Sequence, residues 1–407
     1  MKTRKIRTLL FSTLYPNGIK PNHGIFVETR LRHLLASGRI ETKVVAPVPW
    51  FPLAGERFGK YAEFAKVPKQ ENRHNINIYH PRYPVLPKIG MNLAPVSLAA
   101  ASMPIVNQMI RQGRDFDLID AHYFYPDGVA AAFLGRQLGK PVFITARGTD
   151  INLIPEYKIP RKMILWAASR ASGLITVSAA LKDRLCDIGV APEKITVLRN
   201  GVDLERFRPL GRAEQRSAMG MLSPLLLSVG NLVESKGHDL VIRALALLPD
   251  MHLAIIGEGP EKQALQQLAS SLGVAGRIEF LGSLPQSELP RYYSAADALV
   301  LASSREGWAN VLLEAMACGT PVVATKVGGN PEVVASPAAG ILAETRTPEG
   351  IADAIRALFM NYPDDTRLYA EKFSWDETTA GQLALFEKAL RSPPDPAAST
   401  TPFNPIK

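Results

Sequence analysis

Short apolar segments alternate with helical patterns along almost the whole chain, in two successive series. The first series of expected strands is Ile6–Ser12, Lys43–Ala46, Leu118–Asp120, Val142–Thr145, Leu174–Val177 and Ile195–Leu198. The second series is Leu225–Val229, Leu253–Ile256, Ile278–Leu281, Ala298–Leu301 and Val322–Thr325. Helical segments of about 10–15 residues separate most of them, the pattern of a doubly wound parallel sheet. The sequence therefore predicts an α/β protein with two such sheets.

Two domains are also expected from length, because 407 residues exceed what one hydrophobic core usually holds. The join falls near Phe207–Gly211, so we predict a first domain at residues 1–208 and a second at 209–372. A final helix is expected at 373–390. Residues 391–407, rich in proline and small polar residues, are predicted to be a disordered tail.

Within the first domain, the span from Val48 to Tyr83 contains scattered proline, glycine and charged residues. We expect it to form a long and mostly irregular insert, and such long loops are often functional.

The cysteines and the apolar runs indicate the cellular compartment of the protein. Cys186 and Cys318 lie far apart in the sequence, which argues against a disulfide framework and fits a reducing cytosol. Residues 1–15 are basic with a short apolar run, and we expect a first strand there rather than a signal peptide. The sequence has no run of about 18 apolar residues, so no membrane-spanning helix is predicted.

Charge is distributed unevenly along the chain. Residues 1–210 carry 31 Lys and Arg against 16 Asp and Glu, a balance of +15. The remainder carries 16 against 22, a balance of −6, which gives the net charge of +9. A basic first half suits anionic phospholipid, a lipid-diphosphate acceptor or nucleic acid, or is only a solvated surface. Nucleic acid is disfavoured because no nucleic-acid-binding motif accompanies the charge.

One stretch, residues 304–321, places two carboxylates seven residues apart across a loop-to-helix junction. Asn310 is expected to cap a helix that begins near Val311. Glu306 then lies in the loop before the helix and Glu314 about one turn inside it. Free N–H groups at a helix start can hold an anion, and carboxylates can hold hydroxyl groups. A sugar joined to a diphosphate presents both kinds of group.

The run from Ala298 to Glu332 resembles the donor-binding signature of glycosyltransferase family 4, whose members are retaining enzymes of the GT-B fold. That resemblance implies two Rossmann-like domains facing a cleft, with the helix at 373–390 crossing back onto the first domain. It also implies a catalytic role for Glu306 and a ribose contact for Glu314. Further donor contacts fall on Gly307, Asn310 and Val311. The alternative is an ordinary βαβ unit with two solvated glutamates.

A second motif of the resemblance surrounds Lys236, where a strand ends at Gly230-Asn231 and a helix opens after Lys236. A lysine at such a junction makes an anion site, so Lys236 is expected to neutralise the leaving diphosphate as a catalytic group. Asn231 stands where the family usually has arginine. Gly257 and Glu258 look like a nucleotide-facing loop of the family. The alternative for Lys236 is a plain surface lysine.

Three further strand ends or loops of the first domain resemble family motifs. His122 matches the active-site histidine that contacts the donor sugar, although it could equally be a satisfied core histidine. Arg147 is a candidate phosphate ligand and Asp150 a candidate acceptor ligand, unless the two simply pair with each other. Gly24 and His23 belong to a loop resembling the glycine loop that closes over diphosphate and acceptor, and we assign them to donor and acceptor respectively.

No Asp-x-Asp pair stands where a metal–diphosphate site needs one, and no two histidines show metal-ligand spacing. We therefore expect no catalytic metal and no cofactor besides the nucleotide-sugar substrate. Lys236, Arg147 and helix dipoles would carry the diphosphate charge.

The resemblance to glycosyltransferase family 4 implies a retaining hexosyltransferase that uses a UDP- or GDP-linked sugar. The residues of several motifs, such as 121–128, resemble those of bacterial enzymes of exopolysaccharide or teichuronic-type polymer synthesis. We then expect a lipid-linked saccharide acceptor and a cytoplasmic protein on the anionic inner face of the cytoplasmic membrane. The alternatives are a GT-B nucleotide-sugar 2-epimerase and an inactive partner in a polysaccharide assembly complex.

Overall fold

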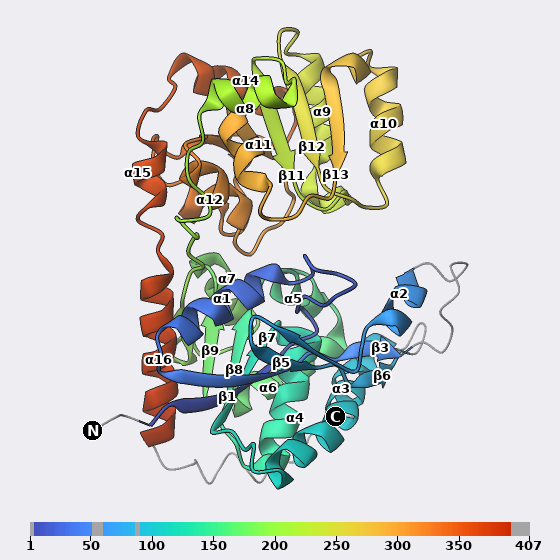
Figure 1. Ribbon diagram of the computed structural model, residues 1–407, viewed down its shortest axis with the longest axis vertical. Coiled ribbons are helices and arrows are strands. Elements are labelled where there is room, and N and C mark those ends of the chain that lie inside the picture. Colours follow the sequence, from blue (N-terminus) through green and yellow to red (C-terminus); the bar gives the residue numbers. More distant parts are fainter. Residues whose placement is uncertain (1–3, 51–59, 86–89, 392–407) are drawn as a thin grey trace. The chain divides into compact units, whose positions relative to one another are not determined.

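The computed structural model describes residues 4–50, 60–85 and 90–391, so the predicted disordered tail lies outside the described part from residue 392 onward. The chain forms two compact units (Figure 1). The first unit runs to Leu198 and takes up the chain again at Asp376, and the second spans Arg199–Trp375.

We predicted the join at residues 208 and 209, and the structural division comes earlier. The segment after Leu198 belongs to the second unit because its polar groups bond there. The Val202 amide donates to the Phe373 carbonyl at 2.9 Å. The Asn200 side chain donates to Asn310 at 3.1 Å.

The first unit is built on an eight-stranded sheet with strand order β10-β9-β8-β7-β1-β2-β5-β4. Its strands are β1 (Ile6–Phe11), β2 (Ile40–Val45), β4 (Gln70–Arg73), β5 (Ile76–Tyr79), β7 (Leu118–His122), β8 (Val142–Ala146), β9 (Gly173–Thr176) and β10 (Ile195–Val197). All neighbours are parallel except β4 and β5. All six strands predicted for this sheet are confirmed.

The insert at Val48 to Tyr83 is more regular than we predicted. It contains α2 (Lys60–Lys66), β4 and β5, and its ends form the two-stranded ribbon of β3 (Val48–Trp50) and β6 (Arg82–Pro84). Part of it, residues 51–59, lies outside the described residues. The pattern was missed because β4 is polar throughout and pairs at the sheet edge, where no apolar alternation is required.

Helices cover the first sheet. They are α1 (Ile25–Ala36), α3 (Gly90–Arg111), α4 (Val129–Leu138), α5 (Thr149–Asn152), α6 (Lys158–Arg170) and α7 (Ala179–Asp187). By length and composition α3 could cross a membrane, which the sequence analysis did not recognise. Its buried side, with Leu98, Val106 and Met109, packs inside the first unit, so α3 is an element of this domain.

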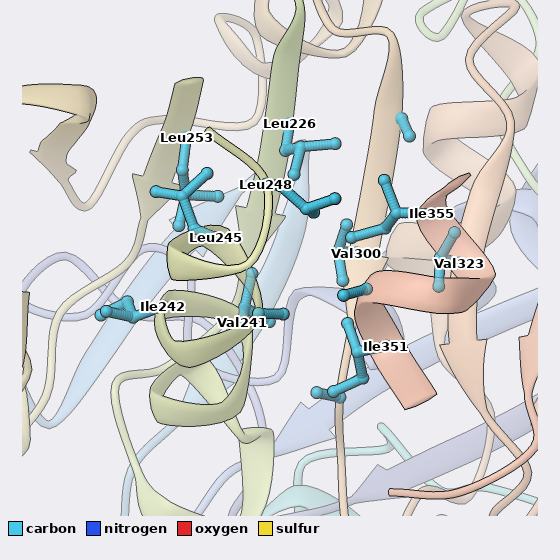
Figure 2. Close-up of a cluster of buried hydrophobic side chains, with 14 of the residues drawn as sticks. Leu226, Val241, Ile242, Leu245, Leu248, Leu253, Val300, Val323, Ile351 and Ile355 are labelled. Atoms are coloured by element: carbon cyan, nitrogen blue, oxygen red, sulfur yellow. The ribbon is translucent and has the colours of Figure 1, made fainter. Parts of the chain in front are cut away.

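The second unit has a six-stranded, all-parallel sheet with the order β13-β12-β11-β14-β15-β16. Its strands are β11 (Leu225–Val229), β12 (His252–Ile256), β13 (Ile278–Gly282), β14 (Ala298–Leu301), β15 (Val322–Thr325) and β16 (Gly340–Ala343). Five of these were predicted, and the edge strand β16 was not. Leu226 and Val300 of the sheet pack with Ile242 and Ile355 of flanking helices in one core (Figure 2).

The helices of the second unit are α8 (Arg212–Met219), α9 (His238–Ala246), α10 (Lys262–Ser271), α11 (Leu289–Ala295), α12 (Asn310–Ala317), α13 (Asn330–Val333), α14 (Pro348–Met360) and α15 (Thr366–Ala370). The central strands β11, β14 and β15 are buried along their whole length. Polar side chains can therefore gather only where these strands end.

The last helix, α16 (Trp375–Arg391), packs on the first unit although it follows the second in sequence. Phe386 is fully buried with its ring 4.9 Å from that of Phe143 on β8. Gly381 lies so close to Leu198 that a Cβ would come within 2.5 Å of its side chain. This helix completes the core of the first unit.

Because Phe386 is fully buried, Phe386→Ala should lower the free energy of unfolding by about 3–5 kcal/mol. Leu390→Ala, on the same helix but 39% exposed, should cost under about 1 kcal/mol. Urea unfolding of both variants measures the difference. Equal losses would show that α16 contributes no buried contact to the first unit.

Candidate functional site

In the second unit, the loops that follow β11, β14 and β15 meet at one edge of the sheet. The Ser304 amide donates to the Ser235 carbonyl at 2.9 Å, which joins the first two loops. Gly237 and Gly328 have φ values of 69° and 49°. A Cβ on Gly237 would lie 2.1 Å from the backbone oxygen of Ala302, and a Cβ on Gly328 would lie 1.8 Å from the backbone oxygen of Glu306. Only glycine permits this approach.

Lys236 and Glu306 pair directly where these loops meet. The Lys236 Nζ lies 2.6 Å from Glu306 Oε1, and the same oxygen accepts a bond from the Ser303 hydroxyl at 2.7 Å. Glu306 is only 9% exposed, so its charge needs this partner. The structure thus places a cation and a carboxylate at the carboxyl ends of neighbouring strands, in the loop predicted for Glu306.

The two predicted glycine loops of this unit pack against each other. A Cβ on Gly257 would lie 1.8 Å from the Gly230 oxygen, and the Leu232 amide donates to the Glu258 carbonyl at 3.0 Å. Asn231 is exposed beside them. The Glu258 carboxylate pairs with Lys262 at 3.0 Å. In this arrangement Glu258 bonds the loop through its backbone, and its side chain lies at the surface.

His238 is a buried residue of this site that the sequence analysis did not single out. Its Nδ1 bonds the Ser228 hydroxyl at 2.9 Å, and its Nε2 is buried near the backbone of Gly230 and Asn231. Burial, together with the neighbouring charge of Lys236, lowers the pKa of His238 to about 4. A neutral imidazole therefore lies beneath Gly230. Its position directly after Lys236-Gly237 was the available signal.

The start of α12 differs from the prediction. Asn310 is the first residue of the helix, preceded by Ala309, and its side chain caps no N–H group. Instead its oxygen accepts from the Asn200 amide. Gly307 is buried before the helix, and Val311 lies partly buried in its first turn. The cap was predicted wrongly because the Asn200 loop, 110 residues away, binds the asparagine side chain.

Glu314 lies on α12 and meets groups that sequence spacing did not reveal. The Tyr293 hydroxyl donates to its Oε2 at 2.8 Å, and the Gln286 side chain also bonds it. Burial raises the pKa of Glu314 to about 7, against the lowering effect of these bonds and of Arg206. This carboxyl therefore changes charge near neutral pH.

In the first unit, Asp150 holds a loop together. Its carboxylate accepts backbone N–H bonds from Phe124 at 2.6 Å, Gly148 at 2.7 Å and Arg147 at 3.1 Å. Asp150 is fully buried. Both of its oxygens bond backbone N–H groups after β7 and β8, and its role toward an acceptor stays a prediction.

His122, at the end of β7, uses both ring nitrogens. Nε2 bonds Asp120 at 3.3 Å and Nδ1 bonds the Arg147 guanidinium. Burial, with the neighbouring Arg147, lowers the pKa of His122 to about 4. The Arg147 guanidinium also lies 5.3 Å over the Phe26 ring, and burial lowers its pKa too. The two predicted residues are thus brought together, bonded to each other.

Helix α16 completes this buried network. Gln382 donates to Asp120 Oδ2 at 2.8 Å and accepts from Arg30 at 2.8 Å. One oxygen of Asp120, Oδ2, therefore bonds both His122 and Gln382. Sequence reasoning missed Gln382, because nothing in its helix distinguishes it from a surface glutamine and it lies 262 residues from Asp120.

The loop after β1 is fastened by Asp127. This carboxylate accepts from the Thr13 amide at 2.7 Å and from the Ser12 hydroxyl at 3.3 Å. Burial raises the pKa of Asp127 to about 7. In the same loop, exposed His23 bonds the Thr13 carbonyl at 3.1 Å. A Cβ on Gly24 would lie 2.3 Å from the Leu14 oxygen, so glycine is required there.

Across residues 4–50, 60–85 and 90–391, no group of three or more His, Cys, Asp or Glu side chains is placed to hold a metal ion. What the two units offer is hydrogen-bonding carboxylates, buried imidazoles and one lysine beside a glycine loop. Such groups bind hydroxyls and anions.

Comparison with known proteins decides the family. Residues 213–374 match the family model "Glycosyl transferases group 1", and residues 27–206 match "Glycosyltransferase Family 4". The chain belongs to glycosyltransferase family 4. The first match contains Lys236 and Glu306, and the second contains His122 and Arg147.

Curated relatives of this glycosyltransferase extend over most of its length. It is 31% identical over 334 residues to the putative teichuronic acid biosynthesis glycosyltransferase TuaC of Bacillus subtilis, covering 80% of this chain and 82% of that protein. It is 32% identical over 315 residues to D-inositol 3-phosphate glycosyltransferase 1 of Catenulispora acidiphila, covering 69% and 74%.

Solved structures establish the GT-B fold. Sucrose-phosphate synthase from Thermosynechococcus elongatus superimposes with a TM-score of 0.77 at 20% identity, covering 95% of this chain and 99% of that chain. HepE of Anabaena, in complex with UDP-glucose, gives 0.69 at 20% identity, covering 93% and 99%. The prediction of two Rossmann-like domains of the GT-B type is confirmed.

The raised pKa of Glu314 gives the glycosyltransferase a testable pH dependence. A carboxyl with a raised folded-state pKa stabilises the fold fully below its unfolded pKa, near 4.5, and loses that contribution as pH rises through about 7. Glu314→Gln should therefore gain stability relative to wild type between pH 5 and pH 8. Urea unfolding at both pH values measures it.

Glu344→Gln is the matched control, since the Glu344 side chain is 83% exposed. It should show no comparable change with pH. A Glu314→Gln difference that stays flat over this range would show that Glu314 is already ionised at pH 5.

Proposed function

We propose that this glycosyltransferase moves a hexose from a UDP- or GDP-linked donor to a saccharide acceptor, with retention at the anomeric carbon. The observation that carries the proposal is the Lys236–Glu306 pair, 2.6 Å apart at the carboxyl ends of β11 and β14. One group suits the diphosphate and the other suits sugar hydroxyls.

Lys236 supplies the positive charge that a leaving diphosphate requires. Its stem passes 3.7 Å from the position of a Gly230 Cβ, so the ammonium group lies beside the glycine loop. Release from Glu306 would let it bind the phosphates, where negative charge develops as the glycosidic bond breaks. Asn231 adds no cation, so Lys236 and backbone N–H groups would carry this charge without a metal.

Glu306 would then orient the donor sugar, and Glu314 the ribose. Glu306 would keep its bond from Ser303 when Lys236 moves to phosphate, which holds the carboxylate in its loop. Glu314 accepts hydroxyl bonds best when ionised, so donor affinity should rise with pH through about 7. HepE, which shares this fold, has been solved with UDP-glucose.

The first unit would contribute His122 and the acceptor contacts. Asp120 and Gln382 hold one side of the imidazole, so His122 would meet a sugar hydroxyl through the nitrogen that now bonds Arg147. His23 would meet the acceptor, because it lies exposed in the loop after β1. With Asp150 committed to the backbone, the loop from Thr13 to Gly24 is the better acceptor candidate.

We further propose a lipid-linked saccharide acceptor in bacterial surface-polysaccharide synthesis, used at the inner face of the cytoplasmic membrane. The similarity to TuaC, named for teichuronic acid biosynthesis, supports a polymer of this kind. The +15 balance of residues 1–210 supports an anionic membrane partner.

A panel of UDP- and GDP-sugars, each incubated with and without membrane lipid extract, tests this function. We expect nucleotide release that depends on acceptor lipid and persists in chelator, with glycosylated lipid as product. Free nucleotide and an altered sugar without lipid would instead identify a 2-epimerase. Lack of turnover with every donor would favour an inactive binding partner. Activity lost in chelator and restored by Mg²⁺ would refute the metal-free proposal.

Lys236→Ala should lower kcat and kcat/KM together by about 10²-fold, the scale of losing one preorganised electrostatic contact. Glu306→Ala should lower kcat by a similar factor, through loss of the sugar contact. Steady-state kinetics with the best donor measures both. Lys372→Ala, an exposed lysine of the same unit, is the control and should change neither constant. Unchanged turnover in Glu306→Ala would overturn its assignment.

A further inference from the structure

Helix α3 presents an unusual outer surface for a helix of this kind. From Gly90 to Ile110 it contains no charged residue. Leu93 and Val96 are 46% and 48% exposed, and Ala100 and Pro104 continue the same exposed side at helical spacing. A helix that faces water normally carries charged side chains on its outer face. The opposite side of α3 is buried in the unit, so the exposed side has the character of a second apolar face.

The apolar surface extends beyond α3 in one direction. Ser97 donates to the Pro84 carbonyl at 3.0 Å, and Pro84 is the register partner of Trp50 across the β3–β6 ribbon. Trp50 is 54% exposed. The ribbon and α3 lie side by side at one end of the first unit (Figure 1). Trp50 therefore lies on the ribbon that packs beside α3.

It extends in the other direction to the start of α6. The Tyr125 hydroxyl donates to the Met91 carbonyl at 2.5 Å and contacts the Met163 sulfur at 3.8 Å. Helices α3 and α6 therefore both contact this buried tyrosine. One helical turn before Met163 lies Ile159, 41% exposed, and Tyr157 beside it is 49% exposed.

Basic side chains border this surface at α6. Lys158, Arg161 and Lys162 are all exposed in the first turns of that helix. The neighbouring Glu156 pairs with Arg184. The result is an apolar strip with a tryptophan at one end, a tyrosine at the other, and three cations beside the tyrosine.

We infer that this surface, which we call the α3–α6 face (Trp50, Met91, Leu93, Val96, Tyr157 and Ile159), docks on an anionic lipid bilayer. Trp and Tyr side chains favour the membrane interface, aliphatic side chains enter the acyl boundary, and Lys and Arg bind anionic headgroups. The inference names the membrane-contacting surface of the proposed function and rests on its claim that the acceptor is lipid-linked.

A second copy of the chain fits this face less well. The α3–α6 face contains no acidic residue, so pairing of two identical faces would supply no opposite charge to the exposed Lys158, Arg161 and Lys162. Anionic headgroups supply the opposite charge. Charge complementarity therefore selects the bilayer as the occupant.

The test uses the full chain and vesicles of phosphatidylcholine, alone or mixed with phosphatidylglycerol, with no sugar substrate present. Leu93→Ser/Val96→Ser should weaken cosedimentation with the mixed vesicles by at least ~10-fold, since each inserted CH₂ is worth about 0.8 kcal/mol. Lys158→Gln/Arg161→Gln should weaken cosedimentation with the mixed vesicles about fivefold for each residue replaced, and only at low salt.

The matched control is Met360→Ser/Leu368→Ser, which removes two more exposed side chains, 80% and 65% exposed, from the second unit. It should bind vesicles like wild type. Trp50 also reports directly, because Trp308 and Trp375 are buried and Trp166 is partly buried. Mixed vesicles should shift the tryptophan emission to shorter wavelength, and Trp50→Phe should abolish that shift.

Equal vesicle binding by the face variants and the control would overturn the inference, as would a blue shift retained in Trp50→Phe. So would a dimer in sedimentation velocity that Leu93→Ser/Val96→Ser dissociates while vesicle binding persists. Turnover with a water-soluble acceptor separates this result from the enzyme's function. Face variants should keep that turnover. Absence of turnover in wild type with every donor, both with water-soluble acceptors and with membrane lipid extract, would refute glycosyl transfer and leave the lipid-binding result standing.

Discussion

Burial of parallel strands on both faces is the constraint on which this protein depends. The strands β7, β8, β11, β14 and β15 expose no side chain to solvent along their length. A polar group within such a strand would lose its hydration without a partner. Chemistry is therefore confined to strand ends, where His122, Arg147, Lys236 and Glu306 are found.

At these ends, carboxylates organise the loops. Asp150 gathers three backbone N–H groups and Asp127 fastens the loop after β1. Glu306 joins Lys236 and Ser303. A buried carboxylate is costly unless it receives such bonds, so each one ties together segments distant in sequence. Pairing of Lys236 with Glu306 also means that, under the proposed function, a diphosphate would compete with Glu306 for the lysine.

Sequence reasoning succeeded for residues whose position follows from local pattern. The strand ends carrying His122 and Lys236 were found because apolar runs stop just before them. It failed where a distant segment determined the bonding. Asn310 was predicted to cap α12, but its side chain bonds Asn200. The strands of the insert were missed because an edge strand such as β4 needs no apolar alternation.

The sequence by itself determined the two α/β domains, the loops that hold the candidate site and the glycines that let those loops approach. These follow from the spacing of apolar residues and from backbone freedom, which are local properties. Only the tertiary structure decided that Gln382 supports Asp120 beneath His122, that Tyr293 bonds Glu314, and that α3 and α6 both contact Tyr125. Those contacts arise when packing brings together segments far apart in the chain, and no local pattern specifies which partners meet.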